Sequence, residues 1–235
     1  MSALAIEGLN IAYGRIPILT DVSFALARGE FLGILGHNGV GKSTLIKCLA
    51  GHLPARGGRI VIDGRDVTGR PAHSRAQAGL GYVPQGRMIF ANLTVEENLR
   101  IGALHLSDTG ARARIENVLE MLPRLKPLLQ QKGGSLSGGE QQILALGRAL
   151  CHEPAIILLD EPTEGIQPSI VQEIAELLVS LKKQDGFSLI VVEQNLSFLA
   201  SVAARVLVMA RGRIVGEMSG ADLGNIDTAH AMMMS

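Results

Sequence analysis

A glycine-rich stretch, GHNGVGKST, combines residue types that bind phosphate. Its first glycine is followed by four residues and then by Gly-Lys-Ser, the spacing of a phosphate-binding loop. Glycines leave backbone N–H groups free to surround an anion, and the helix expected near Lys42 directs its positive end at it. We expect Lys42 to reach the terminal phosphates of a nucleotide and the Ser43 hydroxyl to ligate Mg²⁺. The candidate loop residues are Gly36, His37, Asn38, Gly39, Val40, Gly41, Lys42, Ser43 and Thr44.

A second stretch, IILLDEP, ends an apolar run in two adjacent carboxylates, Asp160 and Glu161. A buried strand here would deliver a carboxylate to its C-terminal edge, where ligands lie in open α/β sheets. Because side chains alternate along a strand, the two acids are expected to point to different sides. We interpret Asp160 as a Mg²⁺ ligand and Glu161 as the general base that activates water.

Simpler structural explanations exist for both stretches. The glycines could form a turn that only caps a helix, and the acids could be the solvated end of a strand before Pro162. The apolar strand FLGIL ahead of the loop and the helical pattern behind it favour phosphate binding. The phosphate-binding loop supports the functional interpretation of the two acids, since a site that hydrolyses a nucleotide needs a metal ligand and a base.

The elements around these stretches predict an α/β fold with one core. We expect three strands near the N-terminus, in a mixed or antiparallel arrangement: LAIEGLNIAY, DVSFAL and FLGIL. We expect a closing β-hairpin at ARVLVMARGRIVGEM. PAIILLDEP and FSLIVVEQN are expected as buried strands around a helix, a parallel β-α-β pattern. We expect one domain over residues 1–235, with residues 1–85 and 151–235 as the nucleotide-binding core and 86–150 as a helical subdomain.

Composition narrows the class of protein further. Hydrophobic residues make up 47% and aromatics 3%, which fits an aliphatic parallel sheet with covering helices. Lys plus Arg and Asp plus Glu number 22 each, so no net field favours nucleic acid as a partner. The six histidines lack metal-ligand spacing, the two cysteines lack a C-x-x-C pattern, and no apolar run is long enough to span a bilayer.

The stretch LSGGEQQ predicts a second helix start with small residues. Ser137 and Glu140 have the spacing of a capping box, and the two glycines loosen the turn. A capped helix is a sufficient structural explanation. The same features also make a second anion site, because a helix N-terminus presents free N–H groups.

Five features of the chain resemble the motifs of the ATP-binding cassette family, and they occur in the family's order along nearly the whole chain. They are Tyr13, GHNGVGKS, Gln85, LSGGEQ and IILLDE. The resemblance implies a P-loop NTPase fold of the ABC ATPase type: a mixed sheet core with an antiparallel β subdomain and a helical subdomain. It also implies ATP and Mg²⁺ as ligands and a dimer that sandwiches ATP. Ser137, Gly138, Gly139 and Glu140 of one subunit would then close over the nucleotide bound by the other.

Tyr13 and Gln85 gain their roles only from this resemblance. Taken alone, Tyr13 is a strand tyrosine and Gln85 a surface residue in a turn. The family pattern implies that Tyr13 stacks on adenine and that Gln85 contacts the metal and the γ-phosphate, as both a metal ligand and a catalytic residue.

Two positions depart from the family pattern. Gln167 stands where members commonly carry an aspartate, and Gln194 where they carry a histidine. An amide can donate a hydrogen bond to phosphate but cannot become charged. We expect Gln194 to be a catalytic residue that positions rather than neutralises, and Gln167 to loosen contacts between the two ATP sites.

Finer features resemble the ATPase subunits of importers for branched-chain amino acids or for urea and short amides. These features are GYVPQGRMIFANLTVEENL, VEQN and DEPTEGIQPS. Within the last of them, EGIQPS favours the urea type of importer. The residues GEQQ in LSGGEQQ favour the amino-acid type. The resemblance implies a second ATPase subunit, the same or different, two membrane permeases and an extracytoplasmic solute-binding protein. The chain would then lie on the cytoplasmic face of the inner membrane, with residues 86–99 and the apolar residues Met88, Ile89 and Phe90 facing a permease.

A different class of function is a soluble ATPase switch that acts without a permease. Such relatives tend to carry two cassettes in one chain or long coiled insertions, and this chain shows neither. Identifying the proteins that copurify with the chain would separate the two.

Overall fold

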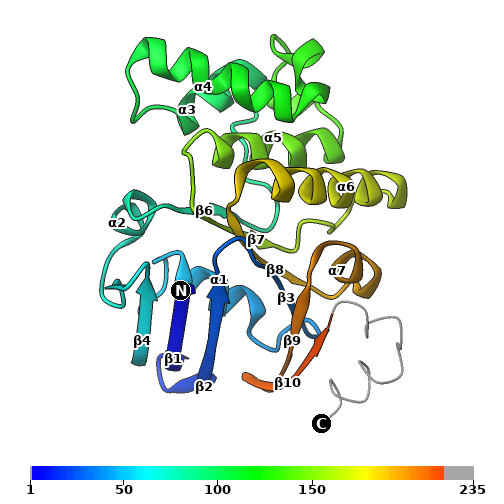
Figure 1. Cartoon of the computed structure of the whole chain (residues 1–235). Helices are drawn as coiled ribbons and strands as arrows, with labels where there is room; N and C mark the ends of the chain where they lie inside the picture. The colour runs from blue at the N-terminus through cyan, green and yellow to red at the C-terminus, as the bar shows by residue number, and fades with distance from the viewer. Residues whose placement is uncertain (1, 220–235) are drawn as a thin grey trace.

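The computed structural model describes residues 2–219, without the side chains of residues 183–185. Its strands form two sheets, one with the order β2-β1-β4-β5 and one with the order β10-β9-β3-β8-β7-β6 (Figure 1). The first sheet consists of β1 (Ser2–Tyr13), β2 (Ile16–Ala27), β4 (Gly57–Ile62) and β5 (Arg65–Asp66). All its pairings are antiparallel, which confirms the expected antiparallel subdomain.

The second sheet carries the parallel core. It consists of β3 (Phe31–Leu35), β6 (Leu80–Val83), β7 (Ile156–Asp160), β8 (Ser188–Glu193), β9 (Arg205–Ala210) and β10 (Arg213–Ser219). Only β10 pairs antiparallel, in the closing hairpin with β9, so the predicted mixed sheet is confirmed. Every residue of β3, β7 and β8 is buried, as the aliphatic composition predicts for strands covered on both faces.

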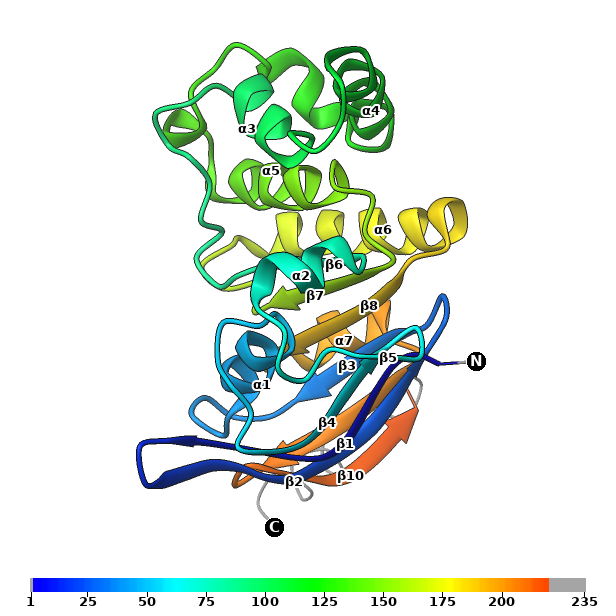
Figure 2. The ribbon, with the colours of Figure 1, turned by 90° about the vertical axis from the view of Figure 1, so that its left-hand side faces the viewer.

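The helices cover the two faces of this sheet unequally. α1 (Lys42–Leu49) lies between the sheets and contacts strands of both (Figure 2). The opposite face is covered by α5 (Gly138–Leu150), α6 (Pro168–Asp185) and α7 (Leu196–Val202). Because side chains alternate, Leu32 and Ile34 of β3 join the core around α1, whereas Phe31 and Leu35 join the core on the other face.

The middle of the chain forms a helical lobe around α5, at the far end of the molecule from the antiparallel sheet (Figure 1). Besides α5 it contains α3 (Val95–Gly102), α4 (Asp108–Met121) and the 3-10 turns η1 (Pro123–Leu128) and η2 (Gly133–Ser135). α3 starts in a capping box, with Thr94 and Glu97 each bonded to the other's backbone N–H. One further helix, α2 (Ala72–Gln77), packs beside β6.

The candidate functional residues lie at the C-terminal edge of the parallel strands. β3, β8 and β7 are neighbours there, so the segments that follow them meet: the loop from Gly36, the residues after Glu193, and Glu161. In the part of the chain that the structure describes, no helix is long and apolar enough to cross a membrane.

Candidate nucleotide-binding site

The phosphate loop joins β3 to α1 in a conformation that requires glycine. Gly41, the N-cap of α1, has φ 109°, and a Cβ there would lie 2.5 Å from Cδ2 of Leu19. A Cβ on Gly36 would lie 2.7 Å from the Met209 carbonyl oxygen. No side chain caps the first turn of α1. Its backbone donors are therefore left available to an anion.

Lys42 is buried in this loop, with 3% of its surface exposed. Its Nζ donates to the carbonyls of Gly36 (2.8 Å) and His37 (3.2 Å) and forms an ion pair with Oε1 of Glu161 at 3.1 Å. Glu161 is itself only 8% exposed. The cation and the candidate base thus satisfy each other, and neither can be removed without leaving the other as a buried unpaired charge.

Ser43 and Asp160 meet beside this pair. The Ser43 hydroxyl donates to Oδ1 of Asp160 at 2.9 Å, and the Tyr82 hydroxyl lies 3.5 Å from Oδ2. Burial raises the pKa of Asp160 and the charge of Glu161 adds to the rise, although the Ser43 hydrogen bond opposes it. Burial, together with Asp160, also raises the pKa of Tyr82. A hydroxyl and a carboxylate that share a hydrogen bond can both turn to a hard cation such as Mg²⁺.

Gln85 contacts acids rather than the expected metal ligands. Its Nε2 donates to Oε2 of Glu161 at 3.3 Å and to Oε2 of Glu164 at 2.9 Å. Among the described residues, no hydrogen bond joins Gln85 to Ser43 or Asp160. The structure therefore brings together Lys42, Ser43, Asp160 and Glu161 and places Gln85 on the outer side of Glu161.

The LSGGE segment forms a capped helix start in the helical lobe. Ser137 is the N-cap of α5, its N–H and hydroxyl donate to Oε2 of Glu140 at 2.9 and 2.7 Å, and the N–H of Glu140 donates back to its hydroxyl. These bonds from Ser137, and more weakly Arg124, lower the pKa of Glu140. No hydrogen bond or ion pair of the described residues links this segment to the phosphate loop of the same chain.

The remaining candidates lie on the surface around the loop. His37, Asn38 and Gly39 are exposed, and Val40 and Thr44 are half-buried. Tyr13 ends β1 with an exposed ring, and Gln194 follows β8 with an exposed side chain that makes no hydrogen bond to the described residues. Gln167 is the exposed N-cap residue of α6 and provides no side-chain cap.

Two residues that the sequence reasoning overlooked are built into the site. Glu193, at the end of β8, is buried and binds the loop that follows Glu161. An acid that ends an apolar strand is the same signal that pointed to Asp160. Arg87 donates to Oε1 of Gln141 in α5 and to the carbonyl of Glu164, both at 3.3 Å, and so links the Gln85 segment to both regions. Its reach depends on left-handed φ values at Arg87 (67°) and Met88 (45°), which the sequence does not reveal.

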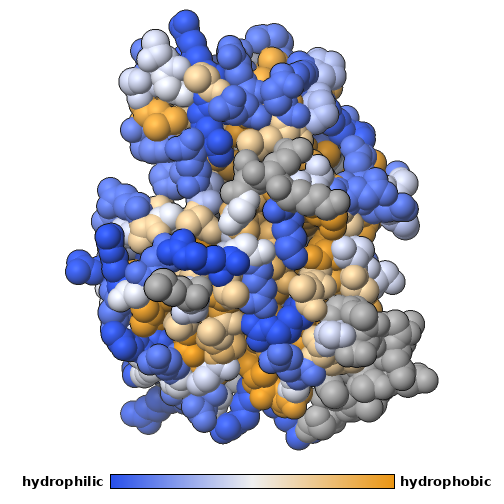
Figure 3. All heavy atoms as spheres, viewed as in Figure 1, coloured by the Kyte–Doolittle hydropathy of each residue, from blue (hydrophilic) through white to orange (hydrophobic). Residues whose placement is uncertain are grey.

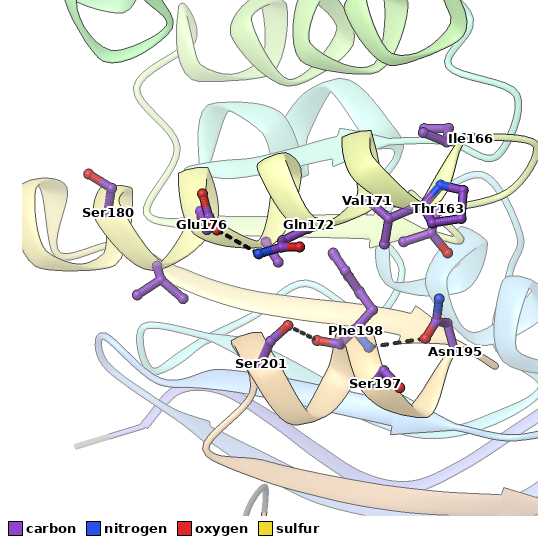
Figure 4. Close-up of a pocket in the computed structure, with 13 residues that line it drawn as sticks. Thr163, Ile166, Val171, Gln172, Glu176, Ser180, Asn195, Ser197, Phe198 and Ser201 are labelled. Atoms are coloured by element: carbon purple, nitrogen blue, oxygen red, sulfur yellow. Dashed lines mark hydrogen bonds between the residues drawn. The ribbon is translucent and has the colours of Figure 1, made fainter.

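A groove of about 830 Å³ opens between α6 and α7, beside the candidate site. Figure 4 shows Thr163 and Asn195 at one end of it and Phe198 reaching toward α6. Figure 3 shows apolar and hydrophilic atoms side by side in the region of these two helices. Thr163 lines this groove and follows Glu161 by two residues in the chain.

Comparisons with known proteins agree with this geometry. The model of a family described as ABC transporter matches residues 19–164. The chain is 40% identical to the high-affinity branched-chain amino acid transport ATP-binding protein BraG of Pseudomonas aeruginosa, over 94% of both chains. It is 34% identical to LivF of Archaeoglobus fulgidus, a probable branched-chain amino acid transport ATP-binding protein, over 88% of this chain and 87% of that one.

Two further similarities extend the range of functions and states. The lipopolysaccharide export system ATP-binding protein LptB of Haemophilus influenzae is 35% identical, over 92% of this chain and 90% of that one. A solved dimeric structure of an ATP-binding cassette in a post-hydrolysis state, bound to ADP and Pi, has a TM-score of 0.81 and 26% identity, over 92% of this chain and 98% of that chain.

The glycine loop, the buried lysine and the acids at the sheet edge fit a nucleoside triphosphate, and the fold around them is that of an ATP-binding cassette ATPase. The chain belongs to the ABC transporter family and is an ATP-binding, ATP-hydrolysing subunit of that kind.

Proposed function

We propose that this chain hydrolyses ATP to drive an importer for branched-chain amino acids. The observation that supports it most directly is the edge of the parallel sheet, where the Lys42–Glu161 ion pair lies beside the Ser43–Asp160 hydrogen bond. The proposed solute rests on the names of BraG and LivF. Urea and short amides, the other solutes that the sequence suggests, are not named in the relatives above.

The chemistry follows from what each residue of the site can do. Lys42 and the N–H groups at the start of α1 bind the phosphates of ATP, and Tyr13 stacks on its base. Ser43 and Asp160 would hold Mg²⁺, which when bound would neutralise phosphate charge, and Gln85 would lie on the outer side of Glu161. Glu161 accepts a proton from the attacking water, and Gln194 positions the terminal phosphate by an amide hydrogen bond.

The Lys42–Glu161 ion pair implies an order of events. In the structure Oε1 of Glu161 is paired with the Lys42 ammonium at 3.1 Å, so this oxygen is not free to contact an attacking water. Phosphate oxygens offer Lys42 a replacement for Glu161. Binding of ATP would therefore free Glu161 for contact with the attacking water.

The second half of each ATP site comes from another ATPase subunit. No hydrogen bond or ion pair of the described residues joins Ser137, Gly138, Gly139 or Glu140 to the phosphate loop of their own chain. Ser137 is exposed and Gly138 and Glu140 are half-buried, whereas Gly139 is buried. We infer that they close over ATP bound to the partner subunit; the solved cassette with ADP and Pi is a dimer. Gln167 lies in the segment that would pass between the two sites.

A permease is proposed to dock on residues 86–99. Met88 and Phe90 are 69% and 46% exposed, although both are large and apolar. Arg148 supports them: its guanidinium lies 5.1 Å from the centre of the Phe90 ring, and its Nη2 donates to the Met88 carbonyl at 2.8 Å. Ile89 between them packs against the core. An apolar pair presented on a fixed backbone fits a membrane-protein partner.

The complete assembly would contain two ATPase subunits, two permeases and an extracytoplasmic binding protein that delivers the solute. This chain would lie on the cytoplasmic face of the inner membrane and be held there through the permeases.

The test is uptake of radiolabelled leucine, isoleucine, valine and urea in cells that lack the chain and are complemented with variants. Wild type should restore uptake of the three amino acids and not of urea, and Lys42→Ala should restore none. Phe90→Ala should lose uptake while the purified protein keeps its ATPase rate. If the wild-type chain restored uptake of urea instead, the proposed solute would be urea and not branched-chain amino acids.

Copurification from mild-detergent membranes separates the remaining alternatives. Multi-span permeases without restored uptake of any of these solutes would favour an exporter such as the LptB system. Soluble companions alone would favour the ATPase switch.

A further inference from the structure

Glu193 is a buried carboxylate that binds two loops of the ATPase site at once. One oxygen, Oε1, accepts the backbone N–H of Thr163 at 2.9 Å and its hydroxyl at 2.6 Å. The other, Oε2, accepts the N–H groups of Gln194 at 2.9 Å and Asn195 at 3.2 Å. The side chain, at the end of β8, is 2% exposed. It therefore joins the segment after Glu161 to the segment that begins with Gln194.

This carboxylate has no cation to balance it. None of the described Lys, Arg or His side chains forms an ion pair with Glu193, and its four hydrogen bonds come from three N–H groups and one hydroxyl. A buried charge is costly unless its hydrogen bonds are complete. A core position that needed only packing would be filled more stably by an apolar residue. The geometry of the two loops is what the carboxylate provides.

Thr163 lies two residues beyond a strained backbone position. Glu161 has φ 46°, a left-handed conformation that is uncommon for a residue with a side chain. Its N–H donates to the Val192 carbonyl of β8 at 3.0 Å. Strained positions persist only where the surroundings hold them. Two anchors to the end of β8 surround this one, the Glu161 backbone bond on one side and the Thr163–Glu193 contact on the other.

We propose that Glu193 and Thr163 are positioning residues for hydrolysis, which hold residues 161–167 against the end of β8 so that Glu161 keeps its orientation. The proposal rests on the proposed role of Glu161 as general base. Neither residue contacts the phosphate loop through a hydrogen bond, so the effect is on turnover and not on nucleotide affinity. The hydroxyl of Thr163 is the part of this contact that can be removed with least disturbance.

The decisive comparison is between Thr163→Val and Thr163→Ser. Valine keeps the shape and the backbone N–H but removes the 2.6 Å donor, whereas serine keeps the hydroxyl. Thr163→Val should lower kcat about tenfold through misplacement of the base, with an unchanged dissociation constant for a fluorescent ATP analogue. Thr163→Ser should return kcat to within about twofold of wild type. Glu193→Gln, which places an amide donor against the N–H groups, should lower kcat at least as much.

A readout without nucleotide tests the same contact directly. Amide hydrogen exchange of residues 161–167 in the protein alone should be faster in Thr163→Val than in wild type and unchanged in Thr163→Ser. Thr68→Val is the matched control, since the Thr68 hydroxyl donates to Oδ1 of Asp66 at 2.7 Å in a region away from the site. It should change neither kcat nor exchange of residues 161–167.

Unchanged kcat or unchanged exchange in Thr163→Val overturns the proposal, as does a loss of nucleotide affinity equal to the loss of kcat. Glu161→Gln is measured in parallel to separate the two levels of inference. If Glu161→Gln hydrolyses ATP normally, the proposed role of Glu161 fails. If Glu161→Gln is inactive but Thr163→Val is normal, only the positioning role fails.

Discussion

The N-terminal ends of α1 and α5 both follow glycine-containing loops, yet they treat their free N–H groups in opposite ways. α1 starts at Gly41, which has no side chain to cap it, and a buried lysine follows. α5 starts at Ser137, whose hydroxyl and N–H are tied to Glu140 in a capping box. The first end is left open for an anion, and the second is satisfied by its own helix.

This difference explains the division of labour in the proposed dimer. The α1 end carries the cation and lies beside the acids, so it can bind and cleave a nucleotide from within one chain. At the α5 end the hydroxyl and N–H of Ser137 and the N–H of Glu140 are already bonded in the capping box. In the proposed dimer this end would add binding energy where an anion brought by a second subunit replaces Glu140 as the partner of Ser137. In the proposed dimer the α1 end would carry out the chemistry, and the α5 end of the second subunit would add contacts to the bound nucleotide.

Removing the cation should have the largest effect. Lys42→Ala takes the ammonium from the α1 end and leaves Glu161 as a buried charge without its partner. ATP hydrolysis should fall by about 10²-fold or more, and the free energy of unfolding by about 3–5 kcal/mol. Turnover assays and urea unfolding measure the two.

Lys42→Ala combined with Glu161→Gln separates the two effects. The double variant has no unpaired charge, so it should recover much of the lost stability while staying inactive. Recovery of activity, or no recovery of stability, would contradict the assigned pairing.

Arg87 connects the two ends, and its removal should have an intermediate effect. Arg87→Ala loses the contacts to Gln141 of α5 and to the Glu164 carbonyl, while the phosphate loop is untouched. Nucleotide affinity should stay constant, and the ATPase rate at saturating ATP should fall about fivefold, the size of effect expected from lost coupling. A steady-state titration in ATP gives both values.

Arg87→Lys keeps the charge but not the two-sided reach of a guanidinium. It should resemble Arg87→Ala. Wild-type behaviour of the lysine variant would mean that the positive charge at this position, and not the link between the two segments, is what matters.

At the α5 end, Ser137→Ala should cost about 1 kcal/mol of stability through the lost cap. It should also reduce the apparent affinity of two subunits for each other in the presence of ATP, because the hydroxyl proposed to contact the partner's nucleotide is gone. Sedimentation of a Glu161→Gln background, with and without ATP, measures the dimer.

Ser107→Ala provides the control for that cap. Ser107 caps α4, where its hydroxyl accepts the N–H of Gly110, so its loss should cost similar stability and leave the dimer unchanged. Equal loss of dimer in both variants would show that the α5 end acts only through helix stability.

The contrast between the two ends was only partly visible in the sequence. Features that depend on local sequence patterns could be predicted, and the structure contains them. They are the strand, glycine loop and helix around Lys42, the acids at the end of β7, and the capping boxes of α3 and α5. β2 begins at Ile16, five residues earlier than the predicted DVSFAL, because Gly14 and Arg15 form a tight turn that lets Ile16 pair with Tyr13.

Contacts between segments were beyond the sequence. β8 lies between β3 and β7, so Glu193 reaches Thr163 across strands that are not consecutive. Gln85 was expected with the metal ligands, but its amide is held by Glu161 and Glu164. Such contacts depend on strand order and on backbone dihedrals that no local pattern specifies.

The smallest expected effect is on the free energy of unfolding, and it comes from the buried carboxylate of Asp160 beside the start of α1. Burial raises the pKa of Asp160 above its ordinary value of 3.8, so its ionised form is less favourable in the folded protein than in the unfolded one. Asp160→Asn should therefore unfold at a higher urea concentration than wild type at neutral pH, while losing the proposed metal ligand and hydrolysis. Oδ1 can still accept from Ser43 in the variant.

The pH dependence gives the sign of this effect. The cost of ionised Asp160 is complete above its raised folded pKa and disappears below its unfolded pKa near 3.8, so the advantage of Asp160→Asn should shrink as the pH falls through that window. Asp66 provides the opposite case, because hydrogen bonds from Thr68 lower its pKa to about 2. Asp66→Asn should be less stable than wild type at neutral pH, with the deficit closing as the pH falls from 3.8 toward 2. If Asp160→Asn were also the less stable protein at neutral pH, attraction to Lys42 and Lys47 would outweigh burial, and the open end of α1 would carry no stability cost.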